Sequence, residues 1–195
     1  MTDLTETVAR GSKTPRAKAL RTKPRGNGGA RKRAGLSEAK LLEFAELLFF
    51  AYRDFTRDPD AILKDFGFGR AHHRVLHFVN RHSGLSVADL LDVLTITKQS
   101  LSRVLKQLID QGYVVQKEGA NDRRQRLLYV TPKGETLAMK LAGLQTARIA
   151  HALAELGPNA HEAACRFLTA MINADHRDSV LRFIARADRA RRGRG

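Results

Sequence analysis

The sequence predicts a mainly α-helical protein with one small β-hairpin, arranged as a winged helix-turn-helix. Three observations in residues 86–131 support this prediction. A capped apolar segment, SVADLLDVL, precedes the short turn TIT and a second amphipathic segment, KQSLSRVLKQLIDQG. Two runs of strand-forming residues then flank a polar, arginine-bearing tip in YVVQKEGANDRRQRLLYVT. Helix, turn, helix and hairpin in this order and at these lengths predict a winged helix-turn-helix.

The first helix of the motif has a clear start signal. Ser86 and Asp89 form an S-x-x-D capping box, whose side chains satisfy N–H groups that have no partner within the helix. Leu90, Leu91 and Leu94 would pack beneath the second helix. We therefore expect this helix to support the one that follows it.

The second helix separates apolar from polar residues. Its apolar residues recur at i, i+3, i+4, i+7 and i+8, which is one stripe of an α-helix: Leu101, Val104, Leu105, Leu108 and Ile109. Its other face carries long or hydroxylated side chains that can reach bases or phosphates in a major groove: Lys98, Gln99, Ser102, Arg103, Lys106 and Gln107. Gly112 follows, where a left-handed residue commonly ends a helix.

The hairpin prediction rests on composition. Residues 113–115 and 127–130 are good strand formers, and residues 118–122 between them are rich in turn formers. The tip is basic because it carries Arg123, Arg124 and Arg126, and such a tip suits the negative potential of a narrow minor groove. We interpret Asp122 as a partner that orients the guanidinium of one of these arginines.

Each feature alone has an ordinary explanation, either a solvated helix face or a polar loop. Their combination in the order of a winged helix-turn-helix favours contact with double-stranded DNA. The candidate DNA-binding residues are Ser86, Thr97, Lys98, Gln99, Ser100, Ser102, Arg103, Lys106, Asp122, Arg123, Arg124 and Arg126.

Four segments between residues 67 and 134 together carry a family resemblance. They are GRAHHRVLHFV, TKQSLSRVLKQL, the D-x-R element of Asp122 and Arg124, and the L-x-x-T-x-x-G pattern in LYVTPKG. The chain resembles the MarR family of bacterial transcription regulators, and GFGRAHHRVLHFV is similar to its PetP-like branch. The resemblance implies a homodimer joined by its terminal helices, with two winged domains on a pseudo-palindrome. It also implies minor-groove insertion of Arg124 and recognition-helix contacts by Ser100, Ser102 and Arg103.

The net charge of +15 is concentrated at the two ends of the sequence. Residues 1–36 hold ten Lys or Arg and two acids, a charge of +8, whereas residues 186–195 hold five Arg and one Asp, a charge of +4. The remainder carries +3. We expect residues 1–36 to be a disordered basic arm and residues 189–195 a basic tail, because neither has enough apolar residues to fold. The arm either adds phosphate contacts or only solubilises the protein.

Helices are expected on both sides of the motif. AKLLEFAELLFFAYRDF, residues 39–55, is apolar on more than one face, which indicates burial on two sides, as in a dimer. Thr131 and Pro132 start a long helix that Gly157-Pro158 ends, and AACRFLTAMI and SVLRFIA lie around a polar break at residues 173–178. We predict dimerisation regions at 37–66 and 132–188, flanking a DNA-binding domain at 67–131.

The composition argues against several other classes of protein. No run approaches about 18 consecutive apolar residues, so a membrane span is not expected. The first residues lack a signal-peptide apolar core, and one cysteine fits a reducing compartment, so we expect a cytoplasmic protein. No catalytic motif is recognisable, and we expect neither an enzyme nor a cofactor.

A metal site is one candidate for a sensing function. His73 and His77 have the i, i+4 spacing of zinc ligands, beside His72, but no carboxylate or cysteine lies near them in the sequence. We therefore expect packed histidines and no metal.

Two further sensing sites are candidates. Cys165 lies in apolar AACRFL and is expected to be a small buried side chain, with oxidation sensing as the alternative. The resemblance implies a candidate effector, because MarR proteins often hold a small aromatic acid between the dimerisation helices and the winged domain. Tyr52, Arg70 and His73 are the candidates to line such a cleft.

The sequence thus predicts a DNA-binding transcription regulator that acts as a homodimer on a pseudo-palindromic operator. Repression is the simpler mode, because a protein bound at such a site blocks RNA polymerase. The alternative is an architectural protein that binds DNA without regard to sequence, for which basic ends would also serve.

Overall fold

The structure is a computed structural model that describes residues 35–119, 122 and 124–192, with side chains up to Ala187. The predicted basic arm therefore lies outside the described residues except for residues 35 and 36, and so do residues 193–195 of the predicted tail. Contacts divide the chain into two units, residues 1–41 and 42–195. The described part of the first unit contains the start of helix α1 (Glu38–Lys64), where the Leu41 N–H donates to the Ser37 carbonyl at 3.2 Å.

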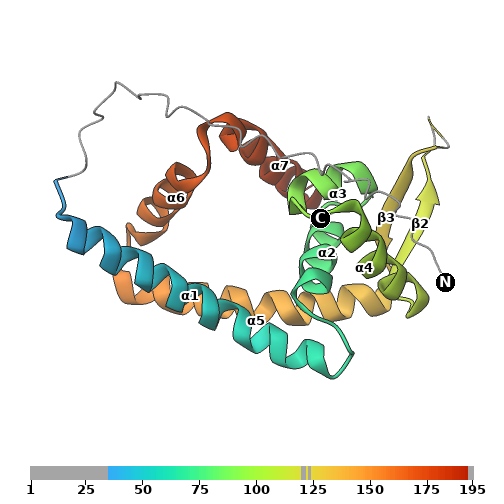
Figure 1. The fold of residues 1–195 in the computed structure, drawn as a ribbon, viewed down its shortest axis with the longest axis horizontal. Coiled ribbons are helices and arrows are strands. Elements are labelled where there is room, and N and C mark those ends of the chain that lie inside the picture. The colour runs from blue at the N-terminus through green and yellow to red at the C-terminus, as the bar shows by residue number, and fades with distance from the viewer. Residues whose placement is uncertain (1–34, 120–121, 123, 193–195) are drawn as a thin grey trace, which may run out of the picture. The chain divides into compact units, whose positions relative to one another are not determined.

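The second unit holds the rest of α1 and all the other described elements (Figure 1). The winged region comprises α2 (Arg70–Arg81), β1 (Leu85–Ser86), α3 (Val87–Leu94), α4 (Lys98–Asp110), β2 (Val114–Glu118) and β3 (Arg126–Val130). It is followed by α5 (Pro132–Leu156), α6 (Ala160–Met171) and α7 (Ala174–Arg192). The predicted mainly helical fold with a small hairpin is confirmed.

The strands form an antiparallel sheet in the order β1-β3-β2. The hairpin register pairs Val114 with Val130 and Glu118 with Arg126, as the predicted strands require. The third strand, β1, was not predicted, because two residues are too few to show an alternating pattern. Its Ser86 pairs with Leu127 and is also the residue that caps α3.

Side chains fix the beginnings of three helices at the predicted positions. Ser86 Oγ accepts the Asp89 N–H at 3.1 Å, and the Asp89 carboxylate accepts the Ser86 N–H, so the capping box is confirmed. Thr97 caps α4 by accepting the Ser100 N–H at 3.1 Å. Thr131 caps α5 before Pro132, and Gly112 has the predicted left-handed φ of 73°. Each cap satisfies a backbone donor that has no partner within the helix.

The core of the winged region lies between α2, α3, α4 and the sheet. The predicted stripe of α4 faces this core, with Leu101 and Leu108 fully buried and Ile109 at its edge. The core also contains the following buried side chains: Val75, Leu76, Val79, Leu90, Leu94, Val114 and Leu128. Burial of this stripe leaves the opposite face of α4 in solvent.

A close backbone contact joins the hairpin to α5. A Cβ built on Gly134 would lie 2.0 Å from the Tyr113 carbonyl oxygen, so only glycine fits there. Thr131 lies beside it, donating from Oγ1 to the Gly112 carbonyl at 2.7 Å and from its N–H to the Tyr113 carbonyl at 3.0 Å. This junction therefore requires the threonine and the glycine of the T-x-x-G pattern.

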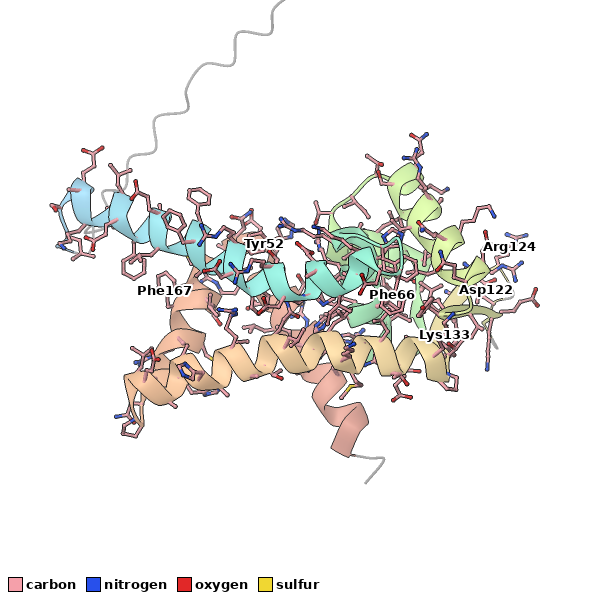
Figure 2. All side chains as sticks on the ribbon, turned by 90° about the horizontal axis from the view of Figure 1, so that it is seen from below. Tyr52, Phe66, Asp122, Arg124, Lys133 and Phe167 are labelled. Atoms are coloured by element: carbon pink, nitrogen blue, oxygen red, sulfur yellow. The ribbon has the colours of Figure 1, made fainter. Side chains whose placement is uncertain are left out.

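α1 from residue 42 onward and α5 lie alongside each other (Figures 1 and 2). Arg148 pairs with Asp58 at 2.9 Å, and Gln145 Nε2 donates to the Phe55 carbonyl at 3.5 Å. Among the described residues, no helix combines the length and the apolar character that crossing a membrane requires.

The predicted polar break at residues 173–178 is wrong in extent. α6 ends at Met171 and α7 begins at Ala174, so only two residues separate the helices. Arg177 explains the tight connection, because its Nη2 donates to the Ala170 and Ile172 carbonyls at 3.0 Å each. The break was predicted too long because polar residues that bind carbonyl groups at a helix end resemble loop residues in the sequence.

Candidate DNA-binding interface

One face of α4 is polar, basic and open to solvent. Its members are all exposed: Lys98, Gln99, Ser100, Ser102, Arg103 and Lys106. Lys106 pairs with Asp110 one turn later, but both side chains are more than half exposed, so water and ions screen this pair. The N-terminus of α4 adds the partial positive charge of its free N–H groups. This face can therefore contact phosphates and base edges together.

Three of the candidate residues also have structural bonds. Ser86 is half-buried and caps α3, and Thr97 Oγ1 caps α4 while donating to Ser100 Oγ at 2.9 Å. These hydroxyls hold the starts of α3 and α4 in place.

The assignment of Gln107 to the polar face is wrong. Its side chain is half-buried, with Oε1 2.8 Å from His72 Nε2 and Nε2 donating to the Gly67 carbonyl at 3.1 Å. At 100° per residue, position 107 falls on the boundary between the two faces of α4, where periodicity alone does not decide burial.

The wing carries Arg124 at the end of the β2–β3 ribbon (Figure 2). Figure 2 shows Asp122 and Arg124 together at this end. Asp122 Oδ1 accepts the backbone N–H of Arg124 at 2.9 Å, so its carboxylate shapes the turn, and its orientation of a guanidinium stays a prediction. Such a local bond is the usual role of aspartate in a turn. Arg123 lies outside the described residues.

Arg126 lies at the base of the wing tip and not at its end. Its Nη1 pairs with Glu118 Oε1 at 2.9 Å, across the last strand pair of the hairpin. The Gly119 N–H then donates to the Gln125 carbonyl at 3.0 Å and closes the tip. Arg124 is therefore the described wing arginine that extends beyond the ribbon.

Comparison with known proteins decides the family. A family model described as the MarR family matches residues 66–125. The HTH-type transcriptional regulator PetP of Rhodobacter capsulatus is 46% identical over 138 residues, which are 71% of this chain and 83% of the relative. The chain belongs to the MarR family. It is a helix-turn-helix transcriptional regulator of the PetP-like branch and not an enzyme.

Solved structures of MarR proteins share the fold. MepR of Staphylococcus aureus in its DNA-binding conformation has a TM-score of 0.59 and 19% identity, and the match covers 66% of this chain and 95% of MepR. A MarR family regulator from Listeria monocytogenes, complexed with 26mer DNA, has a TM-score of 0.59, 20% identity and coverage of 70% and 91%. A MarR regulator from Methanosarcina mazei has a TM-score of 0.57 and 20% identity, and the match covers 70% of this chain and 90% of that protein. The winged helix-turn-helix prediction is confirmed.

The three predicted pocket residues of this MarR chain do lie together. Tyr52, Arg70 and His73 line a cavity of about 220 Å³, with Phe55, Phe78 and Gln145 also in its wall. Arg70 Nε pairs with Asp60 at 2.7 Å, and its Cζ lies 5.8 Å from the centre of the Tyr52 ring. The Asp60 hydrogen bond raises the pKa of Arg70, whose guanidinium lies at the rim of the cavity with the Asp60 carboxylate beside it.

The neighbouring histidines have different environments. Burial lowers the pKa of His73, which is 8% exposed, while Asp60 acts in the opposite direction. Burial also lowers the pKa of His72, against its hydrogen bond to Gln107, which raises it. The ring of His77 packs edge-on against Phe78 at 5.2 Å. Among the residues that the structure describes, no group of three or more His, Cys, Asp or Glu side chains is placed to hold a metal ion.

The expectation that Cys165 is buried is wrong. Its side chain is exposed, since α6 has no buried residue, and its Sγ lies 3.6 Å from His161 Nε2. Cys165, His161 and Arg177 line an open depression of about 430 Å³. Apolar residues beside Cys165 suggested a core position, but α6 exposes Phe167 and Leu168 as well.

Proposed function

We propose that this MarR family regulator is a cytoplasmic homodimeric repressor of transcription that binds a pseudo-palindromic operator. The observation that carries the proposal is the exposed basic face of α4 opposite its buried stripe. In this arrangement α4 enters a major groove, and the wing tip reaches the adjacent minor groove. Two copies related by a two-fold axis read two half-sites about one helical turn, or 34 Å, apart.

The described residues divide into three roles in this proposal. Gln99, Ser102 and Arg103 are positioned to read bases, and Lys98 and Lys106 to contact phosphates. Arg124 inserts into the minor groove from the turn that Asp122 shapes. The Listeria structure with 26mer DNA and the DNA-binding conformation of MepR support this use of the shared fold.

The homodimer is proposed from apolar side chains that one chain leaves in solvent. Phe49 is 74% exposed and Leu168 is 57% exposed, and the Phe44 and Phe167 rings meet at 5.4 Å between α1 and α6. The exposed apolar side chains of α1 are Leu41, Leu42, Phe44, Leu47, Leu48, Phe49, Phe50 and Tyr52. Single chains in solution rarely expose a contiguous apolar surface of this kind. We assign residues 37–66 and 132–188 to dimerisation, and 67–131 to DNA.

Sedimentation measurements test the dimer. Phe49→Glu is expected to shift the protein from dimer to monomer, because it puts a charge into an apolar interface. Glu46→Lys, at another exposed position of the same helix, changes charge without removing an apolar group and serves as the control. A dimer that survives Phe49→Glu unchanged would remove α1 from the interface.

Competition binding tests the regulator against an architectural protein. Genomic fragments that the protein retains are sequenced, and the shared inverted repeat is taken as the operator. The affinity for this operator is expected to exceed that for random DNA by about 10³ or more. A ratio near one would indicate sequence-indifferent binding. Transcription in vitro from a promoter that overlaps the operator then distinguishes repression from activation.

A small aromatic acid is the proposed effector of the cavity lined by Tyr52, Arg70 and His73. Arg70 would pair with the carboxylate, and Tyr52 and Phe55 would contact the ring. Calorimetric titration with benzoate and hydroxybenzoates is expected to give heat that Arg70→Met removes. No heat from any of them would reject this effector class.

Oxidation of Cys165 is a second candidate signal, favoured by the exposure of its thiol. Peroxide should then weaken operator binding by the protein but not by its Cys165→Ser variant, because serine lacks the thiol that peroxide oxidises. Equal loss in both proteins would exclude this cysteine.

Residues 1–36 are proposed as an arm that adds phosphate contacts. Deleting residues 1–34 is expected to flatten the slope of log affinity against log salt, since fewer counterions are released. An unchanged slope would reduce the arm to a solubilising segment.

A further inference from the structure

A closed set of hydrogen bonds connects the beginning of α2 to the middle of α4. The Gly69 N–H donates to His72 Nδ1 at 3.1 Å, and His72 Nε2 lies 2.8 Å from Gln107 Oε1. Gln107 Nε2 donates to the Gly67 carbonyl at 3.1 Å, which returns the set to the segment before α2. We call His72, Gln107 and these backbone groups the α2–α4 brace.

The donors and acceptors of the brace determine one another. A backbone N–H can only donate, so His72 Nδ1 carries no proton and His72 Nε2–H is the donor to Gln107. Gln107 must then present its carbonyl oxygen to His72, which directs its NH₂ group to Gly67. One arrangement of protons therefore satisfies all three bonds. In each bond the donor and the acceptor cannot exchange roles.

The surroundings hold the brace in place. The Phe68 ring stacks on the His72 ring at 4.8 Å with 12° between their planes, and Phe68 is itself buried. Gly67 has a φ of 67°, a left-handed conformation that turns its carbonyl toward Gln107. Arg74, two residues after His72 on α2, donates to the Leu94 carbonyl at the end of α3 at 3.0 Å. α2 is thus the frame against which α3 and α4 are both positioned.

Gln107 lies one turn beyond Arg103 and directly after Lys106 on α4. A bond at Gln107 therefore limits both the rotation of α4 about its axis and its displacement along it. Buried leucines resist separation of α4 from the core, but apolar contacts have little directional preference and tolerate small rotations. Base reading needs side chains held to within about 0.5 Å by neighbours with fixed positions.

We infer that His72 and Gln107 are positioning residues for operator recognition: they fix α4 in the orientation that reads bases. Neither touches DNA in this arrangement. The inference rests on the proposed binding of an operator by α4, and it explains why a glutamine among basic residues is half-buried. Phosphate contacts tolerate small rotations of α4, so loss of the brace affects operator binding and not binding to DNA in general.

Five variants of the full chain test the inference. Gln107→Met keeps the side-chain length and removes both bonds, and His72→Phe keeps the ring on Phe68 but removes its polar atoms. The double variant measures whether the two residues act as a unit. His72→Gln restores a donor near the original Nε2 position. Gln111→Met is the matched control, because Gln111 is an exposed glutamine at the end of the same helix.

The measurements are the dissociation constants for the selected operator and for random DNA, and the thermal midpoint. Gln107→Met and His72→Phe are each expected to weaken operator binding about tenfold, with random-DNA binding unchanged within about twofold. The double variant should be no weaker than the weaker single variant, His72→Gln should recover most of the loss, and Gln111→Met should bind normally. Nitrogen NMR of the wild type should show the His72 proton on Nε2.

Three results would overturn the inference. They are equal loss for operator and random DNA, losses that add in the double variant, and unchanged operator affinity in both single variants. If the His72→Phe protein does not fold, the operator affinity of Gln107→Met and the NMR spectrum of the wild type test the inference instead. A wild-type protein with no preference for any genomic fragment would instead reject the proposed function, so the two failures are distinguishable.

Discussion

Gly134→Ala tests the junction between the wing and α5. The added Cβ would lie 2.0 Å from the Tyr113 carbonyl oxygen and 2.9 Å from its carbon, both backbone atoms that cannot rotate away. Since Cβ atoms essentially never lie within 3.0 Å of another heavy atom, α5 must move by about 1 Å from the Tyr113 carbonyl oxygen. This movement stretches the bonds from Thr131 to the Gly112 and Tyr113 carbonyls.

The expected cost follows from these contacts. Overpacking costs about 1–3 kcal/mol, and two weakened hydrogen bonds cost about 1 kcal/mol each. The helical preference of alanine over glycine returns about 0.5–1 kcal/mol. We therefore expect Gly134→Ala to lower the free energy of unfolding by about 2–4.5 kcal/mol, which is the sum of the two costs less the helical gain.

Urea denaturation at one fixed protein concentration measures this change, because a dimer makes stability depend on concentration. Gly143→Ala is the matched control: it lies in the same helix, and its built Cβ meets nothing within 4 Å. The control is expected to gain about 0.5–1 kcal/mol. If both variants move the urea midpoint alike, the Tyr113 contact does not constrain α5 and the reasoning fails.

Four further changes have expected outcomes. Arg124→Ala should weaken operator binding by about 1–3 kcal/mol and relax the preference for the bases under the wing, measured by fluorescence anisotropy over a set of mutated operators. Lys106→Ala should weaken binding to all sequences alike and reduce the salt slope by about one; a sequence-dependent loss would make Lys106 a base contact. Leu105→Ala, at a 5% exposed position, should lower the free energy of unfolding by about 2–5 kcal/mol in urea, and an unchanged value would invert the assigned faces of α4. Burial lowers the pKa of His73, so the unfolded chain takes up the proton first as the pH falls. The contribution of His73 to stability is therefore unchanged above about pH 6.5 and falls below it. His73→Gln should remove part of that fall in urea denaturation measured across this range, and an unchanged pH dependence would contradict the burial of His73 as its cause.

Features that depend on near neighbours in the chain could be predicted from the sequence. The Ser86–Asp89 capping box, the turn at Gly112 and the buried stripe from Leu101 to Leu108 all depend on residues within one or two helical turns. These interactions join residues of one helix or turn, and helix geometry converts their separation in the sequence into a known separation in space.

Features that depend on distant partners could not be predicted. Gln107 is bound by residues 35 and 40 positions away, and β1 exists only because β3 returns beside it. The bond that Asp122 Oδ1 accepts from the Arg124 backbone N–H was not predicted, because a backbone N–H and a guanidinium are equally near to Asp122 in the sequence. Exposure of Cys165 depends on what packs on α6, which composition does not reveal.

The direct passage from wing to long helix also has a mechanical consequence. One residue, Thr131, separates β3 from α5, and the 25 residues of α5 span roughly 37 Å as a stiff rod. Swinging the hairpin end by about 5° therefore carries the other end through roughly 3 Å, close to the 3.4 Å step between stacked base pairs. In a dimer joined through two such helices, a small rotation of α5 would change the separation of the two wings by about one base-pair step. A DNA site whose half-sites are one base pair further apart would therefore require α5 to rotate or bend.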